Sequence, residues 1–476
     1  MSSDSLWALL LSIFFAVLLF SGGNFLASDS RDAVLAVFGL FVIAISLWRL
    51  RDGLPTRSAK FGLAIFALGV ILMVSQQIEL PSQIWSNFPG RSFLLKDFSA
   101  GSIPDHWAPI SMSPYRTRQD IISLVPALAM FLGVCALPAK NWMLLSWSIV
   151  GVAVVSSLIG LVQRFQGSAG MFNFFPDHVV VTASGFFANH NHFAAQLYCA
   201  IPLIAALALY MTQHQKLPRL VVGVLAVIYI IAMVAGLGAT GSRMGTLLAM
   251  VSVLASIFLL YNSLEGKFQF GASRFTLVGL FVGIVVFAQL GLVGLLRASQ
   301  TDLASDYRGT ISSVSFTALK SFFPVGSGFG SFVPAYQLFE TPETLQPAYV
   351  NHAHNDWLEL IIEGGLPMAI IIALFLIWFL ARVFVIWRSA NASLLAKAFS
   401  ISASLLLLHS IVDYPLRTPP MMAFFAIAMA MLSCGLIQRE KSRPRPTKIS
   451  AGIPQASEPP KFRPRPGGFG GKMGAS

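Results

Sequence analysis

Apolar residues in this chain fall into runs about as long as a membrane-spanning helix. A bilayer core needs roughly 20 apolar residues per helix. A scan at that length finds about twelve runs: 6–26, 33–50, 60–77, 120–137, 142–163, 193–211, 219–237, 244–261, 275–296, 366–387, 395–412 and 420–437. The pattern predicts an all-α polytopic membrane protein. The first run is interpreted as a retained span, because it lacks a basic start and a small-residue cleavage site.

Composition supports the membrane interpretation. The 476 residues are 55% hydrophobic and 11% charged, whereas soluble proteins carry roughly 25% charged residues. The net charge of +12 does not indicate nucleic-acid binding, because the basic residues are scattered among short loops and one tail, as in membrane topology. The three cysteines lie inside apolar runs without metal-ligand spacing, so neither a disulfide framework nor a zinc site is expected.

Lys and Arg residues set the expected orientation. The segment 439–476 is strongly basic and rich in Pro and Gly, which predicts a disordered cytoplasmic tail in contact with membrane lipids. With twelve spans in a transmembrane domain over 1–438, the N-terminus is cytoplasmic too. The long loops 78–119, 164–192 and 297–365 then lie outside, and loops of such length usually have a function. The largest of them connects the ninth and tenth spans.

The largest external loop ends on the stretch HAHNDWLELIIEGG, which gathers histidines and carboxylates. Asp356 and Glu359 have the spacing of a capping box, and Gly364 suits the left-handed residue that ends a helix. A short helix is therefore expected over about 357–363. His354 precedes its N-terminus, where a positive charge is disfavoured, and a general base must be neutral. The alternative role for this histidine is an ordinary hydrogen bond in a loop.

Two arginines stand out at the external side. Arg243 begins the eighth span among several glycines, where a ligand or backbone can approach closely; the alternative is an arginine that snorkels to the interface. Arg308 starts the largest loop, ahead of a turn that contains Gly326 and Gly328. A nucleotide-binding loop is not expected there, because no Lys-Ser/Thr pair follows the glycines.

A further polar segment, ANHNHF, leads into the sixth span from outside. Its side chains include Asn189, His190, Asn191 and His192. Histidines in such a row bind a metal less often than they form ordinary hydrogen bonds, so no metal site is predicted.

These residue types indicate a reaction class. Arginine binds phosphate through paired planar hydrogen bonds, so two arginines suit a diphosphate leaving group, while a histidine suits an attacking hydroxyl. The sequence contains no Asp-x-Asp pair of the kind that holds a metal in nucleotide-sugar transferases. Transfer from a lipid diphosphate without a metal is therefore the expected chemistry.

The ordered motifs resemble those of the O-antigen ligase and O-antigen polymerase superfamily of bacterial inner-membrane glycan transferases. Arg243 and Leu247 match its Arg-x3-Leu motif, and His354 and Gly365 match its His-x10-Gly motif. Arg308 and the following PVGSG turn resemble its loop arginine, and GFFANHN is similar to its Gly-x-Phe-x-Asn-x-Asn segment. The likeness spans most of residues 100–435.

The resemblance implies inverting transfer of a glycan from undecaprenyl diphosphate to an acceptor hydroxyl in the periplasm, without a cofactor. His354 would activate the hydroxyl, with His352 as the alternative, and Arg243 and Arg308 would hold the diphosphate. The substrate-binding residues expected beside them are Asn189, Asn191, His352, Asn355, Gly326 and Gly328.

Three functions remain open at this stage. A ligase transfers to lipid A–core, whereas a repeat-unit polymerase for O-antigen, capsule or exopolysaccharide transfers to another lipid-linked glycan; the ligase motifs favour ligation. A small-anion transporter is the third, but transporters place ionisable groups near mid-membrane. The predicted span centres here hold almost none.

Overall fold

The computed structural model describes residues 2–22, 29–93, 107–167, 170–175, 182–214, 217–263, 303–345, 349–436, 461–464 and 467–468. Internal contacts divide the chain into two units, Met1–Ile437 and Gln438–Ser476. All helices and strands given below belong to the first unit.

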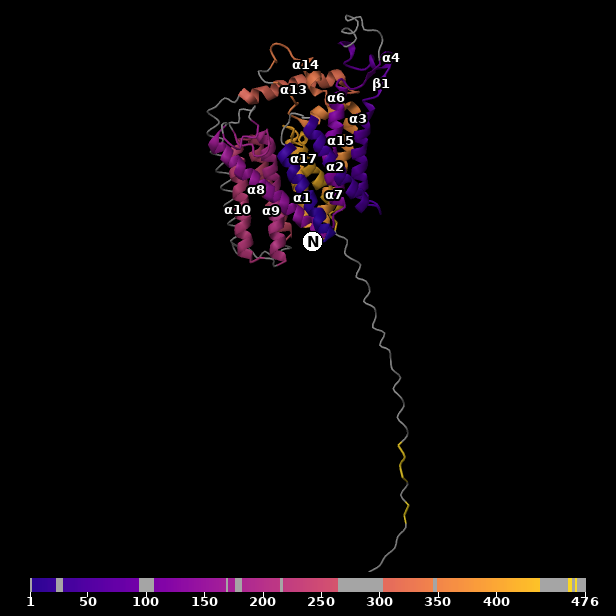
Figure 1. Cartoon of the computed structure of the whole chain (residues 1–476), viewed down its shortest axis with the longest axis vertical. Helices are drawn as coiled ribbons and strands as arrows, with labels where there is room; N and C mark the ends of the chain where they lie inside the picture. Colours follow the sequence, from indigo (N-terminus) through magenta and orange to yellow (C-terminus); the bar gives the residue numbers. More distant parts are fainter. Residues whose placement is uncertain are drawn as a thin grey trace, which may run out of the picture. The chain divides into compact units, whose positions relative to one another are not determined.

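The first unit is a helical bundle (Figure 1). Its helices, in chain order, are α1 (Ser3–Gly22), α2 (Asp29–Arg49), α3 (Arg57–Ser75), α4 (Ser82–Trp85), α6 (Pro114–Ser123), α7 (Val125–Cys135), η1 (Ala139–Asn141), α8 (Trp142–Gln166), α9 (His190–Gln213), α10 (Arg219–Thr240), α11 (Arg243–Ser263), α13 (Leu303–Phe322), α14 (Phe332–Gln337), α15 (Asp356–Arg388), α16 (Leu394–His409), η2 (Pro415–Arg417) and α17 (Pro419–Cys434). Two short strands, β1 (Glu79–Leu80) and β2 (Ala108–Pro109), pair antiparallel.

The helices confirm the all-α prediction. Among the described residues, nine helical segments are long and apolar enough to cross a membrane, and α16 and α17 are shorter apolar helices. Of the twelve predicted runs, the ninth, 275–296, lies outside the described residues, and every other run falls on a helix. The protein is therefore a multi-pass membrane protein, while its orientation stays a prediction.

Two predicted spans differ in detail from the structure. The fourth is broken at Leu124 into α6 and α7, because Pro126 near the start of α7 lacks an N–H to donate to the preceding turn. The tenth is the second part of a longer helix, α15, which continues from the short helix expected before it. Backbone angles inside α15 depart from helical values at Gly365, with φ of 61° and ψ of −152°.

The core of the bundle is built around α9. This helix is buried along most of its length and packs against α8, α10, α11 and α16. Alanines such as Ala194, Ala195 and Ala206 are almost fully buried on it, and small residues let neighbouring helices approach closely. The polar residues that begin α9 are therefore carried into the interior of the protein.

One end of the bundle collects the basic helix termini. Arg49 forms an ion pair of 2.6 Å with Asp4, and Lys140 approaches the same carboxylate at 3.3 Å. The ends of α7 and α17 meet there too, where the free thiol of Cys434 donates a hydrogen bond to Sγ of Cys135 at 3.7 Å. These contacts fix the N-terminus, α2, α7, η1 and α17 to a common end.

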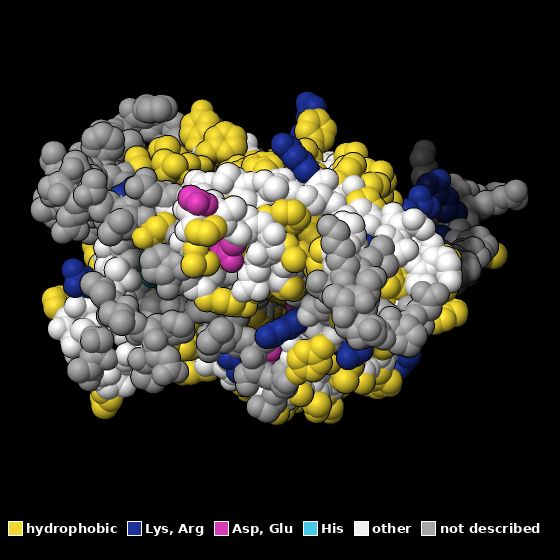
Figure 2. All heavy atoms as spheres, turned by 90° about the horizontal axis from the view of Figure 1, so that it is seen from above, with side chains coloured by type: hydrophobic (Ala, Val, Ile, Leu, Met, Phe, Trp, Pro, Cys, Tyr) yellow, Lys and Arg dark blue, Asp and Glu magenta, His cyan; other side chains and the backbone are white. Residues whose placement is uncertain are grey.

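The opposite end is covered by α13 and α14, which lie across it (Figure 1). Helix α13 packs on α15, and α14 contacts both α13 and α15. Figure 2 looks onto this end and shows hydrophobic side chains around its rim, with only scattered Lys, Arg, Asp and Glu side chains on the described surface. The start of α15 lies beneath this cover and carries three buried carboxylates.

Candidate functional site

The first turns of α15 place three carboxylates on one helical face. The helix is capped by Asn355, whose side-chain oxygen accepts a hydrogen bond from the N–H of Leu358 at 3.0 Å. Asp356 is therefore the first helical residue and not the cap that its spacing to Glu359 predicts. Because residues three, four and seven apart share a face of a helix, Asp356, Glu359 and Glu363 point the same way, and all three are almost fully buried.

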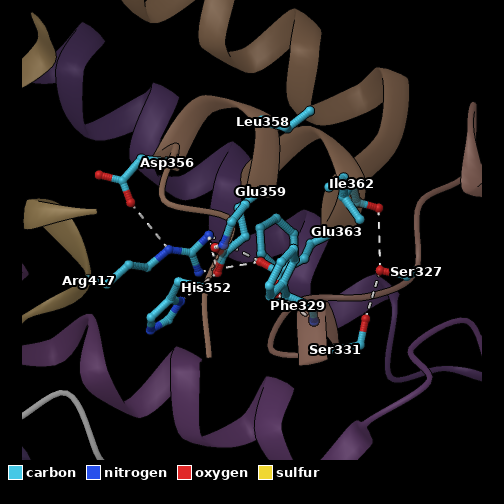
Figure 3. Close-up of polar contacts among 12 residues, drawn as sticks. Ser327, Phe329, Ser331, His352, Asp356, Leu358, Glu359, Ile362, Glu363 and Arg417 are labelled. Carbon is cyan, nitrogen blue, oxygen red and sulfur yellow. Dashed lines mark hydrogen bonds and ion pairs between the residues drawn. The ribbon is translucent and has the colours of Figure 1, made fainter. Parts of the chain in front are cut away.

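Arg417, on η2, meets all three carboxylates (Figure 3). Its Nη2 lies 3.3 Å from Glu359 Oε1 and 3.3 Å from Glu363 Oε2, and its Nε lies 3.5 Å from Asp356 Oδ1. Burial alone would lower the pKa of Arg417, but the three carboxylates raise it above its usual value. A single guanidinium thus ties the start of α15 to the turn between α16 and α17.

His352 shares one of these carboxylates. Its Nδ1 lies 2.8 Å from Glu359 Oε1, while the N–H of Ala353 donates to Glu359 Oε2 at 2.7 Å. Glu359 therefore orients the imidazole and the backbone of the loop at once. The contact directs the other ring nitrogen, Nε2, away from Glu359, because the two nitrogens lie on different edges of the ring.

His354 makes a second histidine–carboxylate pair. Its Nδ1 lies 3.2 Å from Oδ1 of Asp413, which follows α16. Among the described residues, His354 is the only one other than glycine with positive φ, at 51°, and this strained backbone turns its ring toward Asp413. Burial opposes the charge of Asp413, but the hydrogen bond from His354 and the nearby histidines hold its pKa below the usual range.

A chain of polar side chains continues inward from Asp413. Its Oδ2 lies 3.9 Å from Nε2 of His409, whose Nδ1 is 2.9 Å from the hydroxyl of Tyr198 on α9. Residues 198, 409 and 413 are all almost fully buried. At 3.9 Å the contact between Asp413 and His409 is too long for a hydrogen bond. His354, which is 26% exposed, is therefore backed by a buried carboxylate with buried polar side chains behind it.

Tyr414 brings the separate histidine segments together. Its ring centroid lies 4.3 Å from that of His352, 5.0 Å from that of His354 and 4.9 Å from that of His192. The amide nitrogen of Asn189 lies 3.4 Å from its hydroxyl. The loop before α15 and the entrance segment of α9 are therefore neighbours, although they are far apart in the chain.

The predicted polar residues of the α9 entrance have mainly structural contacts. Asn189 caps α9 by accepting a hydrogen bond from the N–H of Asn191 at 2.8 Å. Asn191 is 8% exposed and His192 is fully buried. Neither ring nitrogen of His192 has a hydrogen-bond partner among the described residues, which is unusual for a buried polar group.

The glycine turn after α13 serves close packing. Gly326 and Gly328 have φ of 88° and 103°, and the N–H of Gly328 donates to the carbonyl of Glu363 at 2.9 Å. A Cβ on Gly326 would collide with that carbonyl, and a Cβ on Gly328 would collide with Ser111. Both glycines were predicted to bind substrate. Gly326 lets the turn lie against the break at Gly365, and Gly328 lets it lie against Ser111. The positive φ predicted at Gly364 occurs at Gly365, with an extended ψ and not the left-handed helical one.

The two predicted arginines lie on other elements. Arg243 is the first residue of α11 and is exposed. Arg308 is exposed on α13, and its charge acts on His409. Arg308 is therefore within electrostatic range of His409, while a convergence of both arginines on His354 stays a prediction.

A cavity of about 610 Å³ opens beside the carboxylates. Its polar end contains His352, Glu359, Glu363 and Arg417, and its apolar part lies between α3, α15 and α17. His352 lines this cavity, whereas His354 is not among its lining residues. The His352–Glu359 pair therefore faces the cavity and the His354–Asp413 pair does not, although both histidines contact the ring of Tyr414.

A comparison with protein families finds a match to part of this chain. Residues 228–373 match the Wzy_C family model, described as O-antigen ligase. Over this range the chain is similar to the O-antigen ligase family. The range contains Arg243, Arg308, His352 and His354, so the resemblance seen in the motifs is confirmed over this part of the chain. No curated protein matches the sequence.

Three residues of the site lie C-terminal to the Wzy_C match and were missed by the sequence analysis. Asp413, Tyr414 and Arg417 belong to the short turn VDYPLR between two apolar runs. The signal that could have found them is the pair of opposite charges in a turn of only a few residues. Their partners could not be identified without the fold.

Proposed function

We propose that the protein transfers a glycan from undecaprenyl diphosphate to an acceptor hydroxyl at the periplasmic face of the bacterial inner membrane. The proposed reaction is O-antigen ligation to lipid A–core, with inversion at the anomeric carbon and without a metal or cofactor. The observation that supports this proposal most strongly is the Wzy_C match at residues 228–373. The matched range includes the candidate base His354 and both candidate phosphate-binding arginines, Arg243 and Arg308.

In the proposed step, Nε2 of His354 accepts the proton of the acceptor hydroxyl. The acceptor oxygen attacks the anomeric carbon of the donor, and the bond from that carbon to the diphosphate oxygen breaks. The diphosphate leaves with the bonding electrons, and guanidinium groups stabilise its charge. The proton held by His354 is then released to solvent, so the reaction consumes no other reactant.

Asp413 supports this role for His354. A carboxylate that accepts from Nδ1–H fixes the tautomer in which Nε2 is basic and stabilises the imidazolium that forms. The hydrogen bond of 3.2 Å between the two side chains has that arrangement. Arg417 and its carboxylates serve a different purpose, because they fix the helix that follows the histidines.

The distribution of charge supports the periplasmic assignment. Arg49 and Lys140 cluster at the end of the bundle that holds the N-terminus, and α13 and α14 cover the other end (Figure 1). Cytoplasmic ends of membrane proteins are enriched in Lys and Arg, so the site at the start of α15 belongs on the opposite, periplasmic side.

The test is reconstitution of the full chain in liposomes with a radiolabelled undecaprenyl-diphosphate glycan. Label that appears on lipid A–core supports ligation, whereas longer lipid-linked chains would identify a polymerase. Addition of a chelator is expected to leave the rate unchanged. Absence of transfer to either acceptor, or inhibition that a divalent cation reverses, would contradict the proposal.

A further inference from the structure

Two buried side chains at the end of α16 face each other across a short gap. Nε2 of His409 lies 3.9 Å from Oδ2 of Asp413, and neither atom has a hydrogen-bond partner among the described residues. Both residues are fully buried. Buried polar atoms are usually satisfied, and a gap of this size is one that a single water molecule can bridge. Asp413 therefore presents one oxygen to His354 and the other to His409.

The backbone at the end of α16 fixes this arrangement. The N–H of Asp413 donates to the carbonyl of His409 at 3.0 Å, which places the carboxylate one turn beyond the imidazole. The N–H of Asp356 donates to the carbonyl of Ser410 at 2.9 Å, so the same turn is tied to the first residue of α15. His354 lies two positions before that residue. The turn with Asp413 and the loop with His354 are thus joined by backbone as well as by side chains.

Tyr198 and Asp413 together favour one tautomer of His409. Nδ1 of His409 lies 2.9 Å from the hydroxyl of Tyr198, and a neutral imidazole has one donor nitrogen and one acceptor nitrogen. With the proton on Nδ1, the lone pair of Nε2 would face a buried carboxylate, where electrostatic repulsion is strong. The favoured tautomer therefore carries its proton on Nε2, and the hydroxyl of Tyr198 donates to Nδ1.

Tyr198 is itself firmly held. It lies on α9, the most buried helix of the bundle, and is fully buried. Its carbonyl accepts a hydrogen bond from Oγ of Ser252 on α11 at 2.7 Å. The ring of His409 is thus anchored from the core of the bundle on one side and faces Asp413 on the other.

We propose that His409 is a positioning residue for the candidate base, His354. Its Nε2–H faces Oδ2 of Asp413 and so sets how strongly Oδ1 of that carboxylate stabilises the protonated ring of His354. Tyr198 keeps His409 in the tautomer that this requires. The inference rests on the proposed glycan transfer, in which His354 accepts the proton of the acceptor hydroxyl.

The arrangement determines the direction of the effect. A donor that faces Oδ2 disperses the negative charge of Asp413, because a hydrogen bond to the charged form stabilises that form. Without His409, more of this charge acts on His354, and the protonated ring of His354 becomes more stable. A general base must be neutral to accept a proton, so the reaction then needs a higher pH.

Other titratable groups surround the pair. They are His192 and Tyr198 on α9, His352 and His354 before α15, Tyr414 before η2, and Arg308 on α13. None of them except Tyr198 is altered in the variants that test the proposal, so a change at His354 can be attributed to the contacts of His409.

The test follows the reaction of His354 with diethyl pyrocarbonate, which modifies the neutral imidazole, in the purified full chain over a range of pH. Mass spectrometry separates His354 from His352. His409→Leu should move the midpoint of the His354 profile upward by about half a pH unit or more. His409→Gln keeps an N–H near the position of Nε2 and should remain close to the wild type. Tyr198→Phe should give a smaller upward shift, because it releases only the tautomer.

Two controls accompany these variants. His214→Leu makes the same substitution at an exposed position at the other end of α9 and should leave the midpoint unchanged. The profile of His352 should be the same in all variants. Gel filtration checks folding, and if His409→Leu does not fold, an unmoved midpoint in Tyr198→Phe counts against the proposal.

Transfer in liposomes gives a second readout. His409→Leu should lower kcat at neutral pH at least about threefold and move the pH profile of kcat to higher pH, while donor KM changes little. His409→Gln should restore most of the rate. A residue with only a structural role would not move the pH profile.

Several outcomes would overturn the inference. These are an unchanged or lower midpoint in folded His409→Leu, an equal shift in His214→Leu, and a shift in His409→Gln as large as in His409→Leu. The modification profile needs neither donor nor acceptor. The expected midpoints in a wild type without transfer would therefore contradict only the proposed function, and unmoved midpoints in an active enzyme would contradict only the role of His409.

Discussion

His354 and Asp413 stand 59 positions apart in the sequence, and their side chains meet at 3.2 Å. The carboxylate is almost fully buried and the imidazole is partly exposed. This arrangement engages one ring nitrogen of His354 and leaves the other away from Asp413, which is the relationship on which the proposed chemistry rests.

Replacement of His354 by alanine is expected to reduce transfer by about 10²- to 10⁴-fold, the range typical of a lost general base. The protein should stay inserted and folded, because the side chain is partly exposed and contributes little packing. His352→Ala is the comparison, and its loss should be smaller in the reconstituted assay. Near-normal turnover of His354→Ala would remove it as the base.

Asp413→Asn should lower kcat at least about tenfold while donor KM changes little, because an amide can stabilise the wrong tautomer of His354 and does not stabilise the imidazolium. A readout that separates positioning from stability is the pH profile of kcat, which should shift in the variant. An unchanged profile together with unchanged kcat would show that the contact has no role in catalysis.

The lowered pKa of Asp413 also predicts that the stability of the protein depends on pH. Its pKa is lower in the folded protein than the ordinary value of 3.8, so its stabilising contribution is present above that pH and is lost as the pH falls below it. Unfolding monitored at decreasing pH should therefore show a smaller acid-induced loss of stability for Asp413→Asn than for the wild type. A steeper loss in the variant would contradict the direction of the shift.

Arg308→Lys is expected to weaken donor binding by about tenfold, since a point charge cannot reproduce the planar, two-pronged contact of a guanidinium with phosphate. Lys320→Ala on the same helix is the control, because it removes a charge without altering the proposed contact. Donor affinity in detergent measures the effect. Equal affinity of wild type and Arg308→Lys would exclude the diphosphate contact.

Arg417→Met should destabilise the protein by about 3 kcal/mol, because it leaves several buried carboxylates without their shared cation. Thermal unfolding of the purified protein measures this change. Adding Glu363→Gln to the same chain removes one of those carboxyl groups and should restore part of the loss, as coupled residues do in a double-mutant cycle. Full additivity of the two changes would contradict the ion pair seen at 3.3 Å.

Gly326→Ala should cost more stability than Gly53→Ala. Both glycines have positive φ, at 88° and 101°, so both substitutions carry a backbone strain of about 1–2 kcal/mol. Only at Gly326 does the added Cβ also collide with backbone, at the carbonyl of Glu363, whereas at Gly53 it meets no atom within 4 Å. Equal melting temperatures of the two variants would show that the turn does not press against α15.

Local features explain why some details were predictable and others were not. The short helix after His354 was expected because its cap signals and its glycines are adjacent in sequence. The cap itself is Asn355 and the residue with positive φ is Gly365. Neighbouring residues of similar propensity compete for these positions, and the packing of the glycine turn selects one. Local sequence thus determines that a helix begins and breaks there to within a residue.

The sequence by itself determined the membrane spans, since the bilayer sets the length of an apolar run and composition alone shows it. It also determined which loop holds the histidines. Only the tertiary structure decided their partners: Asp413 for His354, Glu359 for His352 and Arg417 for the carboxylate face. The partner of each side chain depends on which helix ends meet in space. Many residues of opposite charge could form each ion pair as far as the sequence shows, and only packing brings one of them within hydrogen-bonding distance.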